Sequence, residues 1–276
     1  MEPRPHVINA LYTEIFDFPR REAPPALRYM VAAIPRSGST TFCIDLWRTG
    51  VLGAPMEYIN LQNHEANIAR LGEGDVVAYW RNIQLFRTSP NGVFGFKSFV
   101  PNFKRIQKQQ EALLPEIFCD EVVYLTRRDK LGQAISYARA AQTKVWFAGI
   151  HTRVEPKYSY REITGAHRWI ANQEQGWRTI FERTQVTPIE VFHEDALIDI
   201  DPIAQRLADR LGVEFNPARR RLPIPGIEKQ ADDVSASWRD RFLEDEDRAR
   251  RGEPVSTAEE DAAAQAAQRK KAIEPA

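Results

Sequence analysis

The stretch Ile34-Pro35-Arg36-Ser37-Gly38-Ser39-Thr40-Thr41 joins an apolar run, residues 27–34, to a segment with a helical pattern that ends at Arg48. A strand that turns through small residues into a helix leaves backbone N–H groups unpaired at the positive end of the helix dipole. The hydroxyl side chains and the guanidinium of Arg36 add further donors. The stretch therefore predicts a strand, a turn and a helix that together bind a phosphate or sulfate group.

This pattern differs from the ATP-binding loop, in which a glycine and four residues precede Gly-Lys-Ser/Thr. If Gly38 is taken as the second glycine, Ala33 stands in place of the first and Ser39 in place of the lysine. A serine-rich helix cap beside an unrelated arginine is the alternative for any one of these residues. It explains the whole cluster less well than an anion site does.

A second apolar run, residues 121–126, ends in Arg127-Arg128. An enzyme that uses a magnesium nucleotide usually carries a carboxylate near such a strand end to help hold the metal. Two cations at this point instead favour a ligand whose anionic groups are neutralised by side chains. Asp129 is interpreted as the cap of the next helix, on which Ser136 lies close enough in sequence to share one phosphate with an arginine.

Short β-rich runs alternate with helical patterns along the chain, and this alternation is typical of an α/β fold with a parallel sheet. The expected strands are residues 27–34, 93–100, 121–126 and 188–193. The expected helices are residues 40–48, 76–86, 102–114, 129–145, 160–183 and 202–211. We expect a single domain with helices flanking the sheet.

Composition is compatible with one such domain. The chain has 276 residues, of which 43% are hydrophobic, and this is enough to bury one sizeable core. Its 38 basic and 38 acidic residues cancel, so no overall field favours nucleic acid. We find no apolar stretch long enough for a transmembrane segment and no signal core. Cys43 and Cys119 are too few for a disulfide framework or a zinc site, and we expect a cytoplasmic protein.

Five ordered blocks of this sequence resemble the bacterial carbohydrate sulfotransferases typified by trehalose 2-sulfotransferase. The resemblance extends over roughly residues 28–245, and the blocks are residues 36–40, 53–58, 126–146, 173–178 and 228–238. It implies a P-loop-like sulfotransferase fold. We accordingly expect an N-terminal extension over residues 1–26, a sulfotransferase domain over 27–245, and a charged, alanine-rich, flexible tail over 246–276.

The resemblance also implies a donor, 3′-phosphoadenosine-5′-phosphosulfate (PAPS), as co-substrate without a metal. Its 5′-phosphosulfate is expected on the loop formed by Arg36, Ser37, Gly38, Ser39, Thr40 and Thr41. Its 3′-phosphate is expected at Arg127 and Ser136, with Arg128 left open as the alternative arginine. Lys229 stands where the family has a basic loop near the 3′-phosphate. The family further suggests a homodimer.

A sugar hydroxyl is a poor nucleophile until a base accepts its proton. Glu57 is the candidate base, because it matches the family's proposed catalytic glutamate within the block Gly53–Tyr58. Arg36 and Lys97 are candidates to stabilise charge on the leaving phosphate. The histidines are the rival bases, of which His193 ends an expected strand and His167 lies within an expected helix. None has the spacing of a metal site, and we predict no metal.

The acceptor is expected to be a carbohydrate or the headgroup of a glycolipid. Pro35 and Ala54 replace polar residues of the family's sugar pocket, which makes trehalose itself doubtful because polar recognition carries much of such specificity. Aromatic side chains that offer a face to a sugar are Trp80, Tyr137, Trp146 and Trp169, although core packing is the commoner use. Two other functions stay open: a P-loop-like nucleotide kinase or hydrolase, and a non-catalytic protein that binds adenosine bisphosphate.

Overall fold

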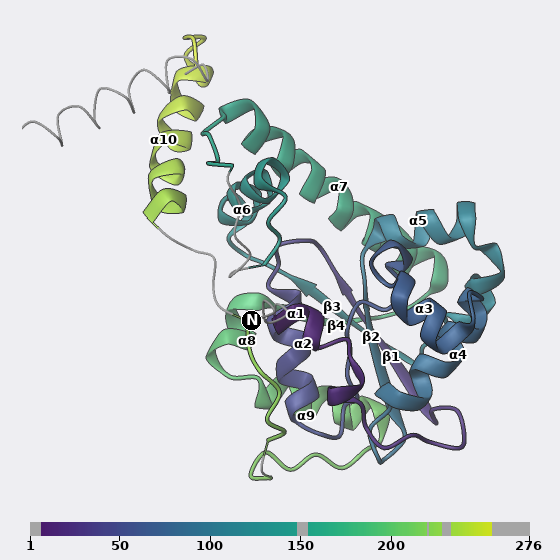
Figure 1. Cartoon of the computed structure of the whole chain (residues 1–276). Helices are drawn as coiled ribbons and strands as arrows, with labels where there is room; N and C mark the ends of the chain where they lie inside the picture. Colours follow the sequence, from purple (N-terminus) through teal and green to yellow (C-terminus); the bar gives the residue numbers. More distant parts are fainter. Residues whose placement is uncertain (1–6, 148–153, 220, 228–232, 256–276) are drawn as a thin grey trace, which may run out of the picture. The chain divides into compact units, whose positions relative to one another are not determined.

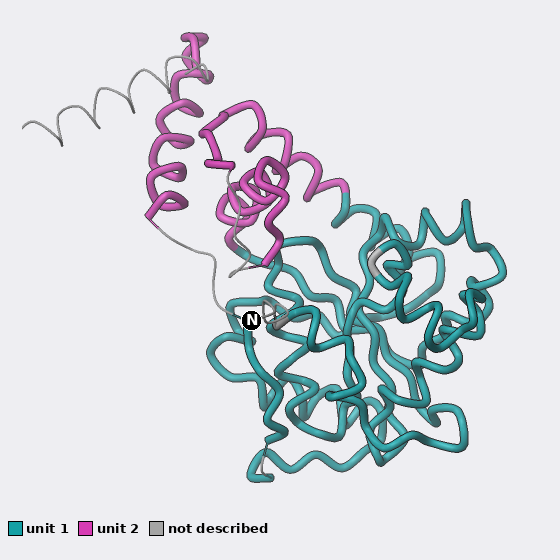
Figure 2. The backbone as a smooth tube through the Cα atoms, in the orientation of Figure 1, with its two compact units in different colours: residues 1–128, 173–227 teal, residues 129–172, 228–276 magenta. Residues whose placement is uncertain are grey.

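The computed structural model describes residues 7–147, 154–219, 221–227 and 233–255. The chain divides into two compact units, shown in Figure 2. Unit 1 comprises residues 1–128 and 173–227, and unit 2 comprises residues 129–172 and 228–276. Lys229 and most of the expected tail, residues 256–276, lie outside the described residues. The domain boundaries expected from the sequence stay a prediction.

Unit 1 is built on a parallel sheet of four strands in the order β2-β1-β3-β4 (Figure 1). The strands are β1 (Leu27–Ala33), β2 (Val93–Ser98), β3 (Glu121–Thr126) and β4 (Ile189–Phe192). In the central strand, Val31 pairs with Lys97 on one side and with Val123 on the other. Helices flank the sheet, so the expected α/β fold is confirmed.

The strands are nearly continuous apolar runs because both faces of a parallel sheet are covered. All residues of β2 are buried, as are the last five of β1. Tyr29 of β1 packs so closely over Gly95 of β2 that a Cβ there would lie 2.5 Å from the tyrosine ring. The Tyr29 hydroxyl donates to the Leu52 carbonyl at 2.7 Å. The glycine thus provides the space that the tyrosine needs.

The helices of unit 1 begin and end at recognisable residues. Asp75 caps α4 by accepting from the amides of Val77 and Ala78, and Gly212 ends α9 in the left-handed conformation. The helices are α1 (Val7–Ala10), α2 (Ser39–Arg48), α3 (Glu65–Gly72), α4 (Val76–Arg87), α5 (Val100–Gln109), α8 (His193–Ile198), α9 (Asp201–Leu211) and the part of α7 (Tyr160–Thr184) that follows residue 172.

Two expectations about helices differ from the structure. The helix expected over residues 102–114 is divided into α5 and a 3₁₀ segment, Glu111–Glu116. Pro115 lies in the second piece, where a missing N–H and a bulky ring oppose continued α-helical bonding. His193, expected at the end of a strand, instead begins α8. Short helices such as α3 and α8 carry a weak periodic signal, and the sequence pattern did not predict them.

Unit 2 contains α6 (Lys130–Thr143), the first part of α7, and α10 (Asp233–Arg250). Asp129 caps α6, as expected, by accepting from the Gly132 amide at 3.0 Å, and it also pairs with Arg239 of α10 at 2.6 Å. The Tyr158 hydroxyl donates to the buried carboxylate of Asp245 at 2.7 Å. Polar contacts to α10 therefore hold this unit together alongside aromatic packing.

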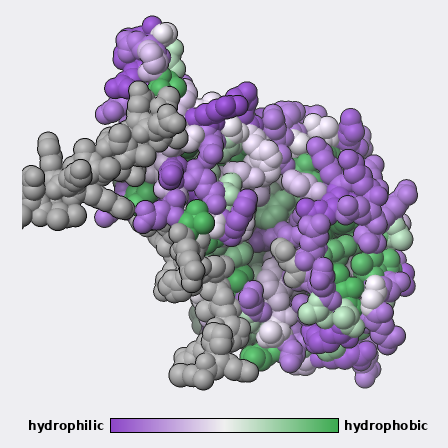
Figure 3. Space-filling view, turned by 45° about the horizontal axis from the view of Figure 1, so that its top comes forward, coloured by the Kyte–Doolittle hydropathy of each residue, from purple (hydrophilic) through white to green (hydrophobic). Residues whose placement is uncertain are grey.

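The face shown in Figure 3 is mostly hydrophilic, with hydrophobic residues in small groups. Within the described part of the chain, no helix is both long and apolar enough to cross a membrane. Both cysteines are free thiols. Burial raises the pKa of the Cys43 thiol to about 12 and that of Cys119 to about 11.

The N-terminal segment is tied to unit 1 by a fully buried arginine. Arg87, at the end of α4, donates to the carbonyls of Leu11 at 3.0 Å and Thr13 at 2.8 Å. Its Nε lies 2.8 Å from the Asp17 carboxylate, and its guanidinium stands over the Trp47 ring at 5.2 Å. A buried charge needs such compensation. These contacts hold residues 11–17 against the end of α4.

Substitution Arg87→Met tests this anchor. It removes the cation while keeping most of the side-chain volume, and it leaves the Asp17 carboxylate and two carbonyls without their partner. We expect the free energy of unfolding in urea to fall by about 3–5 kcal/mol. The control is Arg81→Met, which removes an ion pair whose arginine is 64% exposed. An equal effect of the two substitutions would contradict the assigned role of Arg87.

Candidate functional site

Several of the site residues expected from the sequence, all of them in unit 1, lie at one edge of the sheet. In a doubly wound sheet, ligands bind beyond the carboxyl ends of the strands, where the strand order reverses. The order β2-β1-β3 places this point at the ends of β1 and β3. The loop at residues 34–38 follows β1, Arg127 follows β3, and Lys97 is the penultimate residue of β2 (Figure 1).

The loop after β1 has the geometry of an anion site. Arg36 and Gly38 both adopt positive φ, 66° and 72°, and the chain thereby turns sharply into α2. At the start of α2, the Phe42 amide donates to the Gly38 carbonyl at 3.1 Å. The amides of the first turn, residues 39–41, therefore have no partner inside the helix. The buried Ser37 hydroxyl also has no hydrogen-bond partner among the described residues.

His193 lies directly against this loop, a contact that the sequence did not predict. A Cβ built on Gly38 would lie 2.1 Å from Cε1 of the imidazole. Gly38 is therefore required twice, once for its positive φ and once for the space it leaves. His193 is brought there by β4, the strand next to β3. No local pattern around a single histidine carries that information.

The Glu57 carboxylate is held by three side chains from different segments. Its Oε1 accepts from the side-chain amides of Asn60 at 3.0 Å and Asn102 at 3.3 Å. Its Oε2 lies 3.9 Å from Nζ of Lys97, and that ammonium also donates to Oγ1 of Thr40 at 2.9 Å. Lys97 is 3% exposed and Glu57 is 15% exposed. Lys97 thus connects the loop after β1 with the carboxylate.

The backbone of Glu57 is held as well. Its amide donates to the Tyr12 hydroxyl at 3.3 Å, and its carbonyl lies 2.6 Å from Nε2 of His64. Burial lowers the pKa of His64, so the imidazole is neutral and Nε2 must carry the proton that it donates. Burial and the nearby Glu57 carboxylate raise the pKa of Tyr12 well above its usual value. The phenol therefore stays protonated.

The two arginines after β3 have different surroundings. Arg128 forms a bidentate pair with Asp195, at 2.6 and 2.8 Å, and lies over the Phe192 ring at 4.1 Å. The hydrogen bond from Arg128 lowers the pKa of Asp195. Arg127 lies with its Nε 3.9 Å from Glu194, and its side chain is 25% exposed. Arg128 is thus engaged at the outer surface of unit 1.

Other expected residues are not part of this group. Ser136 lies on α6 in unit 2, so its pairing with Arg127 stays a prediction, and Lys229 lies outside the described residues. Trp80 is fully buried against Phe94 and Phe96, which makes it a core residue. Tyr137, Trp146 and Trp169 form an aromatic cluster in unit 2, with Tyr137 stacked on Trp169 at 4.6 Å.

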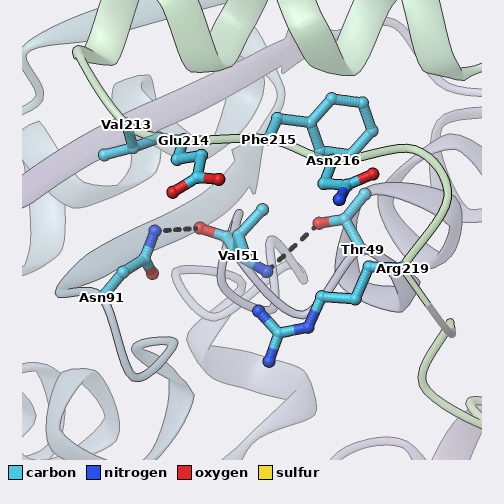
Figure 4. A pocket seen from close by; sticks show the side chains of 8 residues that line it. All are labelled: Thr49, Val51, Asn91, Val213, Glu214, Phe215, Asn216 and Arg219. Carbon is cyan, nitrogen blue, oxygen red and sulfur yellow. Dashed lines mark hydrogen bonds between the residues drawn. The ribbon is translucent and has the colours of Figure 1, made fainter.

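A separate cavity of about 430 Å³ opens elsewhere in unit 1 (Figure 4). Its lining comes from the segments that follow α2, precede β2 and follow α9, and it contains none of the expected site residues: Thr49, Val51, Asn91, Val213, Glu214, Phe215, Asn216 and Arg219. In the described part of the chain, no three histidine, cysteine, aspartate or glutamate side chains are placed to hold a metal ion.

Two characterised proteins whose sequences are similar to this chain carry the same name. The chain is 29% identical to trehalose 2-sulfotransferase of Mycolicibacterium smegmatis, over 80% of this chain and 96% of that protein. It is 28% identical to trehalose 2-sulfotransferase of Mycobacterium tuberculosis, over 78% of this chain and 93% of that protein.

Solved structures are similar at lower identity. A sulfotransferase domain from the curacin biosynthetic pathway is 18% identical, with a TM-score of 0.41 over 70% of this chain and 76% of that one. A sulfotransferase domain from the Synechococcus PCC 7002 olefin synthase is 15% identical, with a TM-score of 0.44 over 80% of this chain and 90% of that one.

The model of the Stf0 sulphotransferase family matches residues 28–245, which is most of the chain. The resemblance inferred from the five sequence blocks, and with it the enzyme class, is thereby confirmed. This protein belongs to the Stf0 sulphotransferase family.

Proposed function

We propose that this enzyme transfers a sulfuryl group from PAPS to a hydroxyl group of a carbohydrate or glycolipid, with Glu57 as the general base. One observation carries the proposal. A buried lysine, Lys97, contacts both Thr40 of the anion-binding loop and the carboxylate of Glu57. In this proposal the donor anion and the proton acceptor would lie on either side of one cation.

The loop after β1 suits the 5′-phosphosulfate of the donor. First-turn amides, the Ser37 hydroxyl and the Arg36 guanidinium supply donors, and Gly38 allows the positive φ with which the loop turns into α2. Bound there, PAPS supplies an activated sulfuryl group whose leaving group is a phosphate. The chain's part is to orient that group and to stabilise the charge that develops on the leaving oxygen.

Glu57 has the features of a base that accepts the proton of an acceptor hydroxyl. As the new S–O bond forms, this proton passes to the carboxylate, and the bond between sulfur and the donor phosphate breaks. The two asparagines fix Oε1, while Oε2 lies towards Lys97 and the loop. We assign to Lys97 and Arg36 the role of stabilising the phosphate that leaves.

Arg127 is our choice for the donor's 3′-phosphate. Arg128 already makes a bidentate pair with Asp195 and has half of its side chain in solvent. Binding a phosphate end-on would require this guanidinium to give up its pair with Asp195. Ser136 and Lys229 complete the proposed 3′-phosphate site on the strength of the family resemblance alone.

The acceptor class is proposed from the relatives, both of which are named as trehalose 2-sulfotransferases. Ala54 is fully buried, and its amide donates to the Arg87 carbonyl at 3.1 Å, so it offers nothing polar to a sugar. We therefore propose a carbohydrate or the headgroup of a glycolipid as the acceptor, with a trehalose-like sugar among the candidates. Trp146, 37% exposed and packed on Tyr137, provides an aromatic face suited to a sugar ring.

The test of the proposed activity is incubation with donor labelled with radioactive sulfur and a panel of sugars and glycolipids, followed by determination of the product's mass and linkage. Labelled carbohydrate supports the assignment. Binding of 3′,5′-adenosine bisphosphate without magnesium, and more tightly than ADP or ATP, separates this enzyme from a kinase. Preference for a magnesium nucleotide would contradict the proposal. A homodimer and a cytoplasmic location stay predictions from the sequence.

Substitution Gly38→Ala tests the donor loop. The added Cβ meets the His193 imidazole and is strained at a φ of +72°, so we expect the affinity for adenosine bisphosphate to fall more than tenfold in calorimetry. Gly212→Ala is the matched control, because Gly212 has a φ of +66° with open space around it. If both variants bind the nucleotide as the wild type does, the loop is not the donor site.

Substitution Glu57→Gln tests the base. The amide has nearly the same shape but cannot accept the proton, so we expect kcat to fall by a factor of about 10²–10⁴. Adenosine bisphosphate binding should change little. Glu65→Gln, at an exposed glutamate in the first turn of α3, is the control and should retain full turnover. Unchanged turnover in Glu57→Gln would remove Glu57 from the mechanism.

A further inference from the structure

The segment before β1 contacts the residue proposed as the base. We define the strap as residues 8–17, which lie ahead of the family match at residues 28–245. Ile8 and Leu11 of the strap are buried, at 5% and 0% exposure. A segment outside the family's domain would ordinarily be a peripheral extension. Here, however, the strap belongs to the packed interior of unit 1.

The strap is held at three points by one side chain. Arg87 bonds the carbonyls of Leu11 and Thr13 and pairs with Asp17. Because the guanidinium is planar and its donors point in fixed directions, these contacts set the orientation of the backbone around Tyr12. One hydrogen bond on each side of residue 12, to the carbonyls of Leu11 and Thr13, restrains the backbone from which the Tyr12 side chain projects. These contacts therefore fix the position of the Tyr12 phenol.

That place is the backbone of Glu57. The Tyr12 hydroxyl accepts from the Glu57 amide, while Nε2 of His64 donates to the Glu57 carbonyl. The two rings also pack on one another, with centroids 4.7 Å apart. Both polar groups of the Glu57 backbone are therefore bonded by one pair of side chains whose rings are in contact. This is an unusual degree of restraint for a residue in a loop.

We propose that the strap is part of the active site, and that Tyr12 and His64 are positioning residues for the Glu57 carboxylate. The inference depends on the proposed role of Glu57 as base. The asparagines and Lys97 restrain the carboxylate itself, and Tyr12 with His64 restrains the backbone from which it projects. A segment that precedes the matched sulfotransferase domain thereby completes the site. Small displacements of a catalytic group lower the rate steeply, which gives such restraint its value.

Substitution Tyr12→Phe is the main test, because it removes only the oxygen that accepts from the Glu57 amide. Hydrogen exchange followed by mass spectrometry should show about fivefold faster exchange in a peptide covering residues 55–60, the factor of one typical hydrogen bond. With an active acceptor, kcat should fall about tenfold while the KM for donor stays constant. The exchange arm requires no acceptor and no turnover.

Tyr29→Phe is the matched control. It removes the hydroxyl of a fully buried tyrosine that donates to the Leu52 carbonyl rather than to the Glu57 backbone. We expect a comparable loss of stability, with no change in kcat and none in exchange at residues 55–60. The inference is overturned if both variants speed hydrogen exchange at residues 55–60 equally, or if Tyr12→Phe leaves that exchange unchanged. In either case the strap does not specifically restrain the Glu57 backbone.

His64 provides a rescue test. Glutamine places an N–H donor near the position of Nε2, whereas leucine fills space without donating. We expect His64→Gln to retain most of kcat and of the protection at residues 55–60, and His64→Leu to lose both. Equal behaviour of the two variants overturns the positioning role. If wild type and Glu57→Gln turn over equally, the proposed base fails, and the exchange measurements alone then decide whether the strap holds this loop.

Discussion

Much of the site depends on one buried ammonium group. Lys97 is almost excluded from water, and a desolvated cation requires anionic or strongly polar partners. Thr40 in the first turn of α2 and Glu57 in a separate loop supply them. The charge therefore draws the anion-binding turn and the carboxylate loop to the same strand end. A sulfuryl donor and an acceptor hydroxyl need that same proximity, so the interaction that organises the loops also suits the family's chemistry.

The local elements were predictable because they depend on neighbouring residues. The strand–turn–helix at residues 27–48 follows from an apolar run, a glycine and a helical pattern, and β3 agrees with its expected bounds. The parallel sheet followed from the alternation of strands and helices. The helix at residues 102–114 was predicted too long, because its apolar spacing continues past the point where Pro115 limits α-helical bonding.

The parts of the site that the sequence did not predict depend on contacts between distant segments. Glu57, Lys97 and the glycine loop were recognised from motifs. Asn102, however, reaches Glu57 across 45 residues, and so does Tyr12 from the other direction. A lone asparagine or tyrosine gives no local signal of such a role. His193 illustrates the same limit, since only the order of the strands brings it to Gly38.

The contact between Gly38 and His193 also has an evolutionary consequence. Since the imidazole fills the space in which a side chain at position 38 would lie, these two positions cannot drift independently. Among descendants of this sequence, any gain of bulk at position 38 has to be accompanied by a smaller residue at 193 and by a rebuilt backbone turn. The steric contact therefore predicts that substitutions at these two positions are coupled.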